Sequence, residues 1–185
     1  CSSDLPWVLE NRPGAGSTIG ADAVAKAAPD GQTLLLASLT FAVSAATYKK
    51  LPYDAVKDFT PVAPVGMAVS LLAVHPGVAA NNIREFVELA RATPGTITFG
   101  SSGSGGVPHL AGELFKMQNK LFITHIPYRG TGPALQDLVA GQVDMMFDTL
   151  AGAAPFIKSG QLIAVAVASS KRSDAFPNVP TAQEL

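Results

Sequence analysis

Residues 96–115 read Thr-Ile-Thr-Phe-Gly-Ser-Ser-Gly-Ser-Gly-Gly-Val-Pro-His-Leu-Ala-Gly-Glu-Leu-Phe, which predicts a short buried strand, a glycine- and serine-rich turn and the start of a helix. Pro108 suits the first helical position, because the amide hydrogen that it lacks has no partner there. The loop offers backbone N–H groups and hydroxyls, and a helix N-terminus adds about half a positive charge. This combination suits a carboxylate or another small anion. A tight connection without a ligand fits the same residues, so both interpretations stay open here.

Strand-like and helix-like segments alternate along the rest of the chain with short links between them. This alternation predicts an α/β fold with a parallel sheet. Strands are expected at 69–74, 96–100, 122–125, 143–147 and 162–168, and helices are expected to start at Asn81 or Asn82, at Pro108, at a Thr131 cap and at Ala151.

The first 60 residues contain two further candidate strands. Residues 7–9 resemble the end of a buried strand, and residues 33–37 form an apolar run that suits a strand covered on both faces. Between them, Ser17 or Thr18 is expected to cap a helix that runs to about Ala28. Ser38 and Thr40 follow the second run, at the strand end where open α/β sheets place their ligands. The alternative role of both residues is to cap a short helix over 41–48.

Composition narrows the function classes. The chain has 185 residues, of which 48% are hydrophobic and 15% charged, so a sizeable core is expected and disorder is not. A net charge of −1 without a basic cluster argues against a nucleic-acid partner. Cys1 is the single cysteine and the three histidines lack metal-ligand spacing, so neither a metal nor a cofactor is expected. No apolar run reaches the roughly 18 residues that a membrane span needs.

Several polar residues near the predicted strand ends are candidates for a chemical or binding role. A hydrolase would use Ser101 or Ser104 with His109, but the loop lacks a clean Gly-x-Ser-x-Gly elbow. His109 lies in the first helical turn, where it faces a ligand or caps its own backbone. His125, at a strand end, is expected to be a hydrogen-bonded structural residue.

Two acidic residues accompany the strand predicted at 143–147. Asp144 is expected to face solvent or a helix dipole. Asp148 leaves the strand on the same side of the sheet as the glycine- and serine-rich loop, so it is a candidate acceptor for a ligand ammonium group or a bound water. The alternative is that Asp148 caps the next helix, and the sequence does not separate the two roles.

With these residues in view, the chain resembles the substrate-binding proteins of tripartite tricarboxylate transporters, also called the Bug family. The resemblance runs from about Trp7 to the end of the chain, in the family's order. Its motifs include Val8-Leu-Glu-Asn-Arg-Pro-Gly-Ala-Gly16, Ala25-Lys-Ala-Ala-Pro-Asp-Gly-Gln-Thr-Leu-Leu-Leu36, Phe99-Gly-Ser-Ser-Gly103, His109-Leu-Ala-Gly-Glu-Leu-Phe115, Pro127-Tyr-Arg-Gly130 and Ala140-Gly-Gln-Val-Asp-Met-Met-Phe-Asp148.

The resemblance implies a two-domain, hinged periplasmic receptor of the type 2 binding-protein class. Such a receptor closes on a small carboxylate and delivers it to membrane carrier subunits, without chemistry on the ligand and without inserting into the membrane itself. It implies a partial first domain at 1–72 and a nearly complete second domain at 73–185. Family members also carry a signal peptide and a longer C-terminal segment, so the chain is expected to be a fragment, with residues 1–5 foreign to the gene.

In the family, ligands lie between the domains and are held by loop amides, hydroxyls and ordered waters. The resemblance therefore points to a set of ligand-binding residues on both sides of a cleft. Where many members have Asn-Pro after the first of these loops, this chain has Ala45-Ala46. The predicted set is Ser38 and Thr40 from the first domain and Ser101, Ser102, Gly103, Ser104, Gly105, His109, Gly130, Thr131 and Asp148 from the second.

Overall fold

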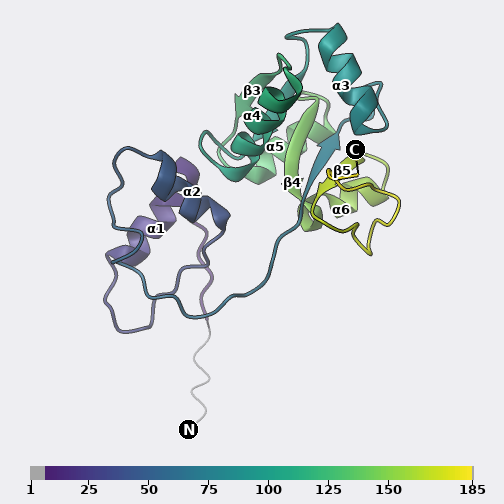
Figure 1. The fold of residues 1–185 in the computed structure, drawn as a ribbon. Coiled ribbons are helices and arrows are strands. Elements are labelled where there is room, and N and C mark those ends of the chain that lie inside the picture. The colour runs from purple at the N-terminus through teal and green to yellow at the C-terminus, as the bar shows by residue number, and fades with distance from the viewer. Residues whose placement is uncertain (1–6, 185) are drawn as a thin grey trace.

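A computed structural model describes residues 7–184, so the expectation about the origin of residues 1–5 lies outside the described residues. The C-terminal part, from residue 69 onward, is built on one five-stranded sheet (Figure 1). The strand order across the sheet is β3-β2-β4-β1-β5. The strands are β1 (Ser70–Val74), β2 (Thr98–Ser101), β3 (Thr124–Pro127), β4 (Met145–Thr149) and β5 (Ile163–Ala168).

The sheet is mixed, and the prediction of a parallel sheet was wrong for one strand. β2 pairs in parallel with β3 and β4, whereas β1 runs antiparallel to both β4 and β5. Ser70, the first residue of β1, therefore lies beside Thr149, the last residue of β4. Alternation of strands and helices gives the order of elements along the chain, but it does not give the direction in which the first strand crosses the sheet.

Helices cover both faces of this sheet. α3 (Ile83–Ala92) and α4 (Val107–Asn119) pack on one face, where Phe86, Phe99 and Phe115 form an apolar cluster. α5 (Thr131–Val139) and α6 (Leu150–Lys158) pack on the other face through residues such as Leu138 and Met146. The predicted helices are confirmed with small shifts at their ends, including Val107 rather than Pro108 at the start of α4.

Asn82 caps α3, as the sequence predicted for one of the two asparagines. Its side-chain oxygen accepts a hydrogen bond from the Glu85 amide at 3.0 Å, and a Glu85 carboxylate oxygen accepts from the Asn81 amide at 2.8 Å. The Asn82 side chain thus satisfies an amide that the first helical turn leaves unpaired, and the Glu85 carboxylate holds the residue before the cap, in an arrangement close to a capping box.

The N-terminal part contains only helices as regular structure within the described residues: η1 (Ala15–Ser17), α1 (Thr18–Ala25) and α2 (Leu39–Thr47). The strands predicted at 7–9 and 33–37 were wrong, and side chains such as Trp7 and Leu36 are 80% and 76% exposed. A strand needs a neighbour for its N–H and C=O groups, and no described strand lies beside these runs. The predicted cap by Ser17 or Thr18 is also wrong, because neither side chain accepts a hydrogen bond from the α1 amides.

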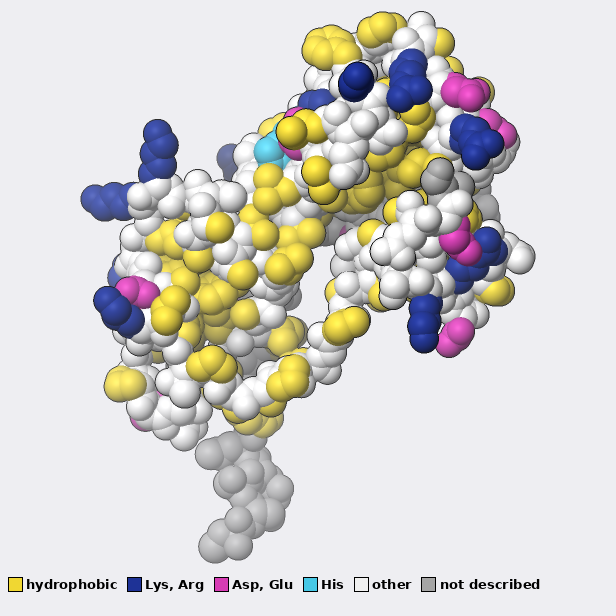
Figure 2. All heavy atoms as spheres, viewed as in Figure 1, with side chains coloured by type: hydrophobic (Ala, Val, Ile, Leu, Met, Phe, Trp, Pro, Cys, Tyr) yellow, Lys and Arg dark blue, Asp and Glu magenta, His cyan; other side chains and the backbone are white. Residues whose placement is uncertain are grey.

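The two parts are joined by an extended segment, residues 61–69, which enters β1 (Figure 1). They also touch directly: a Cβ placed on Gly105 would lie 3.4 Å from the ring of Tyr48, the residue that ends α2. Figure 2 shows hydrophobic side chains gathered over the N-terminal part and along the segment, where Val62, Val65 and Met67 are exposed. The predicted boundary between residues 72 and 73 would cut β1, and the division into two domains stays a prediction.

No helix among the described residues is both long and apolar enough to cross a bilayer.

Candidate functional site

Three helix N-termini meet at one edge of the sheet. β2, β3 and β4 run in the same direction, so their carboxyl ends lie at a common edge. Each strand is followed directly by a helix: α4 after β2, α5 after β3 and α6 after β4. The partial positive charges of three helix ends are thus collected where the predicted loops lie, which is favourable for an anion.

The glycine- and serine-rich loop, residues 101–106, connects β2 to α4. Gly103 and Gly105 have φ angles of 127° and 80°, which side chains other than that of glycine rarely tolerate. The hydroxyls of Ser102 and Ser104 make no hydrogen bond within residues 7–184, and Ser104 is exposed. Both hydroxyls are therefore free to donate to a ligand.

Two histidines lie beneath this loop. The Oγ atom of Ser101 is 2.6 Å from Nε2 of His125, while Nδ1 of His109 accepts a hydrogen bond from the Gly105 amide at 3.1 Å. Burial, and secondarily the charge of His109, lower the pKa of His125 to about 4, so His125 is neutral near pH 7. The expected hydrogen-bonded role of His125 is confirmed.

The predicted pairing of His109 with Ser101 or Ser104 does not form within residues 7–184. His109 makes no hydrogen bond to a serine in the described chain, and its acceptor nitrogen is occupied by Gly105. The pair that does form, Ser101 with His125, has no carboxylate hydrogen-bonded to the other His125 nitrogen among residues 7–184, and Ser101 is 0% exposed. Nothing here matches a nucleophile, a base and an orienting third group.

Gly130 and Thr131 lie at the N-terminus of α5, next to the first loop. Gly130, with φ of 116°, is the N-cap residue and Thr131 the first helical residue, so the predicted Thr131 cap was wrong by one position.

The β2–α4 and β3–α5 connections approach each other closely at Tyr128. A Cβ on Gly103 would lie 3.4 Å from the carbonyl oxygen of Tyr128. The Tyr128 hydroxyl donates to Oδ2 of Asp137 at 2.7 Å; burial and this bond raise the Tyr128 pKa to about 12.

Asp148 lies near the end of β4, at the predicted edge but on the opposite face of the sheet from the two histidines. It is 4% exposed; Oδ1 accepts from the Thr149 amide at 2.7 Å, and Oδ2 has no partner within the described residues. Burial raises the pKa of this carboxyl. The helix cap is Thr149, whose hydroxyl accepts from the Gly152 amide at 3.2 Å, so the alternative in which Asp148 caps α6 was wrong.

Asp144 has a structural role that the sequence did not predict. Its Oδ2 atom accepts hydrogen bonds from the amide and the hydroxyl of Thr98, at 2.8 and 2.9 Å. The expectation that Asp144 faces solvent or a helix dipole was wrong, because the carboxylate joins β2 to the start of β4.

Ser38 and Thr40 lie in the N-terminal part, at the start of α2. The Ser38 hydroxyl accepts a hydrogen bond from the Thr40 amide at 3.3 Å, which is the alternative capping role for this residue. No hydrogen bond of either residue within 7–184 reaches the loop at 101–106. α2 contacts that loop through Tyr48, at the other end of the helix, about 13 Å away at 1.5 Å per residue.

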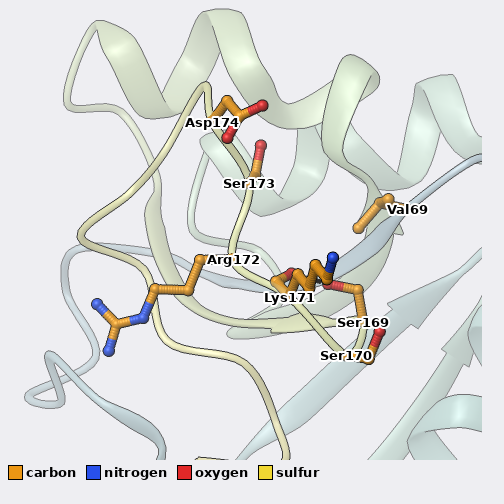
Figure 3. A pocket seen from close by; sticks show the side chains of 7 residues that line it. All are labelled: Val69, Ser169, Ser170, Lys171, Arg172, Ser173 and Asp174. Carbon is orange, nitrogen blue, oxygen red and sulfur yellow. Dashed lines mark hydrogen bonds between the residues drawn. The ribbon is translucent and has the colours of Figure 1, made fainter.

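A separate hollow of about 340 Å³ lies at the end of β5, lined by Val69 and residues 169–174 (Figure 3). None of the predicted site residues lines it. Lys171 and Arg172 border it, and Arg172 donates hydrogen bonds to the Glu184 carboxylate at 3.0 Å and to the Pro177 carbonyl.

Comparison with known proteins identifies the family. Residues 4–185 match the family described as "Tripartite tricarboxylate transporter family receptor". The chain belongs to this family. The resemblance seen in the sequence is confirmed, and family members are solute-binding receptors, not enzymes.

Relatives and solved structures of the receptor family agree with the fold. "Protein BugT" of Bordetella pertussis is 39% identical over 97% of this chain and 56% of its own length. A structure titled "R. palustris Rpa4515 with adipate" is 32% identical with a TM-score of 0.91, over 96% of this chain and 60% of that one. "MatC (Rpa3494) from Rhodopseudomonas palustris with bound malate" is 38% identical with a TM-score of 0.85, over 92% and 58%.

The α/β fold is therefore that of the periplasmic binding proteins, as predicted. The chain spans about half the length of the curated relatives that it matches.

Proposed function

We propose that this chain is part of an extracytoplasmic receptor that captures a small carboxylate, such as a di- or tricarboxylate, an amino acid or a related organic acid. The receptor would pass its ligand to the membrane carrier subunits of a tripartite tricarboxylate-type uptake system. The full-length protein would reach the periplasm by a signal peptide. Family membership supports the receptor role, and relatives solved with adipate and with malate support the ligand class.

One observation carries the proposal. The loop at 101–106 presents two hydroxyls, those of Ser102 and Ser104, at the N-terminus of the 13-residue helix α4, and neither has a hydrogen-bond partner within residues 7–184. A carboxylate placed there accepts charge-assisted hydrogen bonds from neutral donors and is stabilised by the helix end. Gly130, Thr131 and Asp148 lie at the same sheet edge and are proposed to complete this wall of the site. Ser38 and Thr40 are proposed to face it from the N-terminal part.

A binding screen tests the proposal. The full-length gene product is titrated with mono-, di- and tricarboxylates and amino acids while its melting temperature is followed. A ligand present at 100 times its Kd stabilises the folded state by about 2.7 kcal/mol, which is readily measured. If no carboxylate raises the melting temperature, the proposed function is refuted.

A double substitution, Ser102→Ala with Ser104→Ala, tests the site itself. Two lost hydrogen bonds to a charged ligand should weaken binding at least about tenfold. Ser159→Ala is the matched control, because Ser159 follows α6 at the end of the helix away from the site. Equal affinities of the double variant and the control would show that the ligand is held elsewhere.

A further inference from the structure

We propose that His125 and His109 are positioning residues, which fix the shape of the loop at 101–106 from beneath so that its free donors face the ligand. The inference rests on the proposed function, because it concerns the same loop. It also assigns Ser101 a different role from the predicted one. Ser101 is fully buried, so its hydroxyl serves the loop and not the ligand.

The first anchor joins β3 to the loop. The Ser101 Oγ atom is 2.6 Å from Nε2 of His125, and it also accepts from the Gly103 amide at 3.2 Å. The same hydroxyl lies 3.2 Å from the Gly103 carbonyl oxygen. His125 therefore holds the Ser101 hydroxyl, which contacts both the amide and the carbonyl oxygen of Gly103. Gly103 itself has a φ of 127°, a backbone conformation that favours glycine.

The second anchor joins α4 to the loop. Nδ1 of His109 accepts a hydrogen bond from the Gly105 amide at 3.1 Å. The other nitrogen, Nε2, lies 4.0 Å from Oε1 of Glu113, within the same helix. The Gly105 N–H is therefore paired within the protein and is not available to a ligand. The hydroxyls of Ser102 and Ser104 remain as side-chain donors of the loop without a partner in residues 7–184.

Both rings are held by stacking. The ring centroids of His125 and Phe99 are 4.6 Å apart, and those of His125 and His109 are 4.2 Å apart. Lys116 covers Phe99 at 5.6 Å from the ring centroid and pairs with Glu113 at 2.8 Å. A histidine in this stack cannot rotate without displacing its neighbours, so the two anchors are rigid.

The arrangement amounts to preorganisation. The loop leaves β2, while the groups that hold it come from β3 and α4, so three elements determine its shape before a ligand arrives. A ligand that meets ordered donors does not lose affinity to the ordering of the loop. The pKa of His125, about 4, keeps its anchor in the neutral form near pH 7.

The test compares substitutions that keep or remove each anchoring atom. His125→Gln places an amide group where Nε2 lies, and His109→Asn places an oxygen where Nδ1 lies. His125→Leu and His109→Leu remove the polar anchoring atom at each position. Two readouts are taken on the full-length protein. They are the amide exchange rates of Gly103 and Gly105 by NMR without ligand, with Gly160 as a distant control, and the Kd for adipate and for malate.

We expect His125→Leu to accelerate exchange at Gly103 and His109→Leu to accelerate it at Gly105, each about tenfold, while Gly160 is unchanged. The Kd of a bound probe should rise by a similar factor. His125→Gln and His109→Asn should bring the exchange rates and the Kd to within about threefold of the wild-type values. If loss of ring packing alone caused the effect, these two variants would behave like the leucine variants. Ser101→Ala should accelerate Gly103 exchange less in the His125→Leu background than in the wild-type protein, because the two residues share one interaction.

The proposal is overturned if the leucine variants leave loop exchange unchanged, or if glutamine and asparagine fail as completely as leucine. Failure of the proposed function has a different signature. In that case wild-type protein binds neither probe, and the exchange rates alone decide whether the histidines position the loop.

Discussion

Gly112 of α4 allows Phe99 to pack directly against the helix, and replacing it with alanine should disturb the ring stack under the loop. A Cβ at Gly112 would lie 2.4 Å from Cε2 of Phe99 and 2.8 Å from two further ring atoms. Such distances require the ring to move, and Phe99 is fully buried. Overpacking of this kind typically destabilises a protein by about 1–3 kcal/mol.

Gly132 of α5 provides the matched control, since a Cβ there would meet nothing within 4 Å. Both substitutions gain helix propensity, worth up to about 1 kcal/mol. The difference between Gly112→Ala and Gly132→Ala therefore isolates the steric effect, about 1–3 kcal/mol, or roughly 2–12 °C in melting temperature for a chain of this size.

Urea unfolding of the two variants, followed by far-UV circular dichroism, measures this difference. Tryptophan fluorescence is less suitable, because the single tryptophan, Trp7, lies in the N-terminal part. Equal unfolding midpoints for the two variants would refute the conclusion that Gly112 is required by Phe99.

Three further predictions concern stability. Burial raises the folded-state pKa of Asp148, so the folded state binds this proton more tightly than the unfolded state and loses stability as pH rises between the two pKa values. Asp148→Asn should accordingly raise the melting temperature at pH 7 but not below about pH 3.8, the ordinary value; an equal or lower melting temperature at pH 7 contradicts this. Asn82→Ala removes the cap of α3 and should lower stability by about 1 kcal/mol in urea unfolding, with Asn81 as an unaffected control position. Tyr128→Phe removes the hydrogen bond to Asp137 and should destabilise by about 1.5 kcal/mol at pH 7; no change would mean that this partly exposed bond is compensated by water.

The sequence predicted most of the elements around the candidate site, because local signals define them. Glycine, serine and proline punctuate residues 101–108, and an asparagine, Asn81 or Asn82, marks a helix start. These signals depend on near neighbours in the chain. They therefore held for α3 and for the loop before α4, with errors of one or two residues.

Features that depend on distant residues escaped prediction. Ser101 and His125 are 24 positions apart and meet only because β2 and β3 pair in parallel, with Phe99 opposite His125. Both residues lie near the ends of their strands, and this could have indicated the contact. It does so only once β2 and β3 are known to be neighbours in the sheet. The direction of β1 and the absence of strands at 33–37 likewise depend on which neighbours are present.

The antiparallel direction of β1 determines where the backbone between the two parts is free of sheet pairing. Residues 61–68 are exposed and unpaired in any ladder, whereas from Ser70 onward the backbone is bonded to β4 on one side and β5 on the other. Val69 sits at the junction, and its carbonyl accepts from the amide of Leu150, the first residue of α6, at 2.8 Å. If the two parts rotate relative to each other, the rotation is absorbed before Val69. Segment 61–68 therefore ends beside the start of α6, which is also the helix end that borders Asp148 of the candidate site.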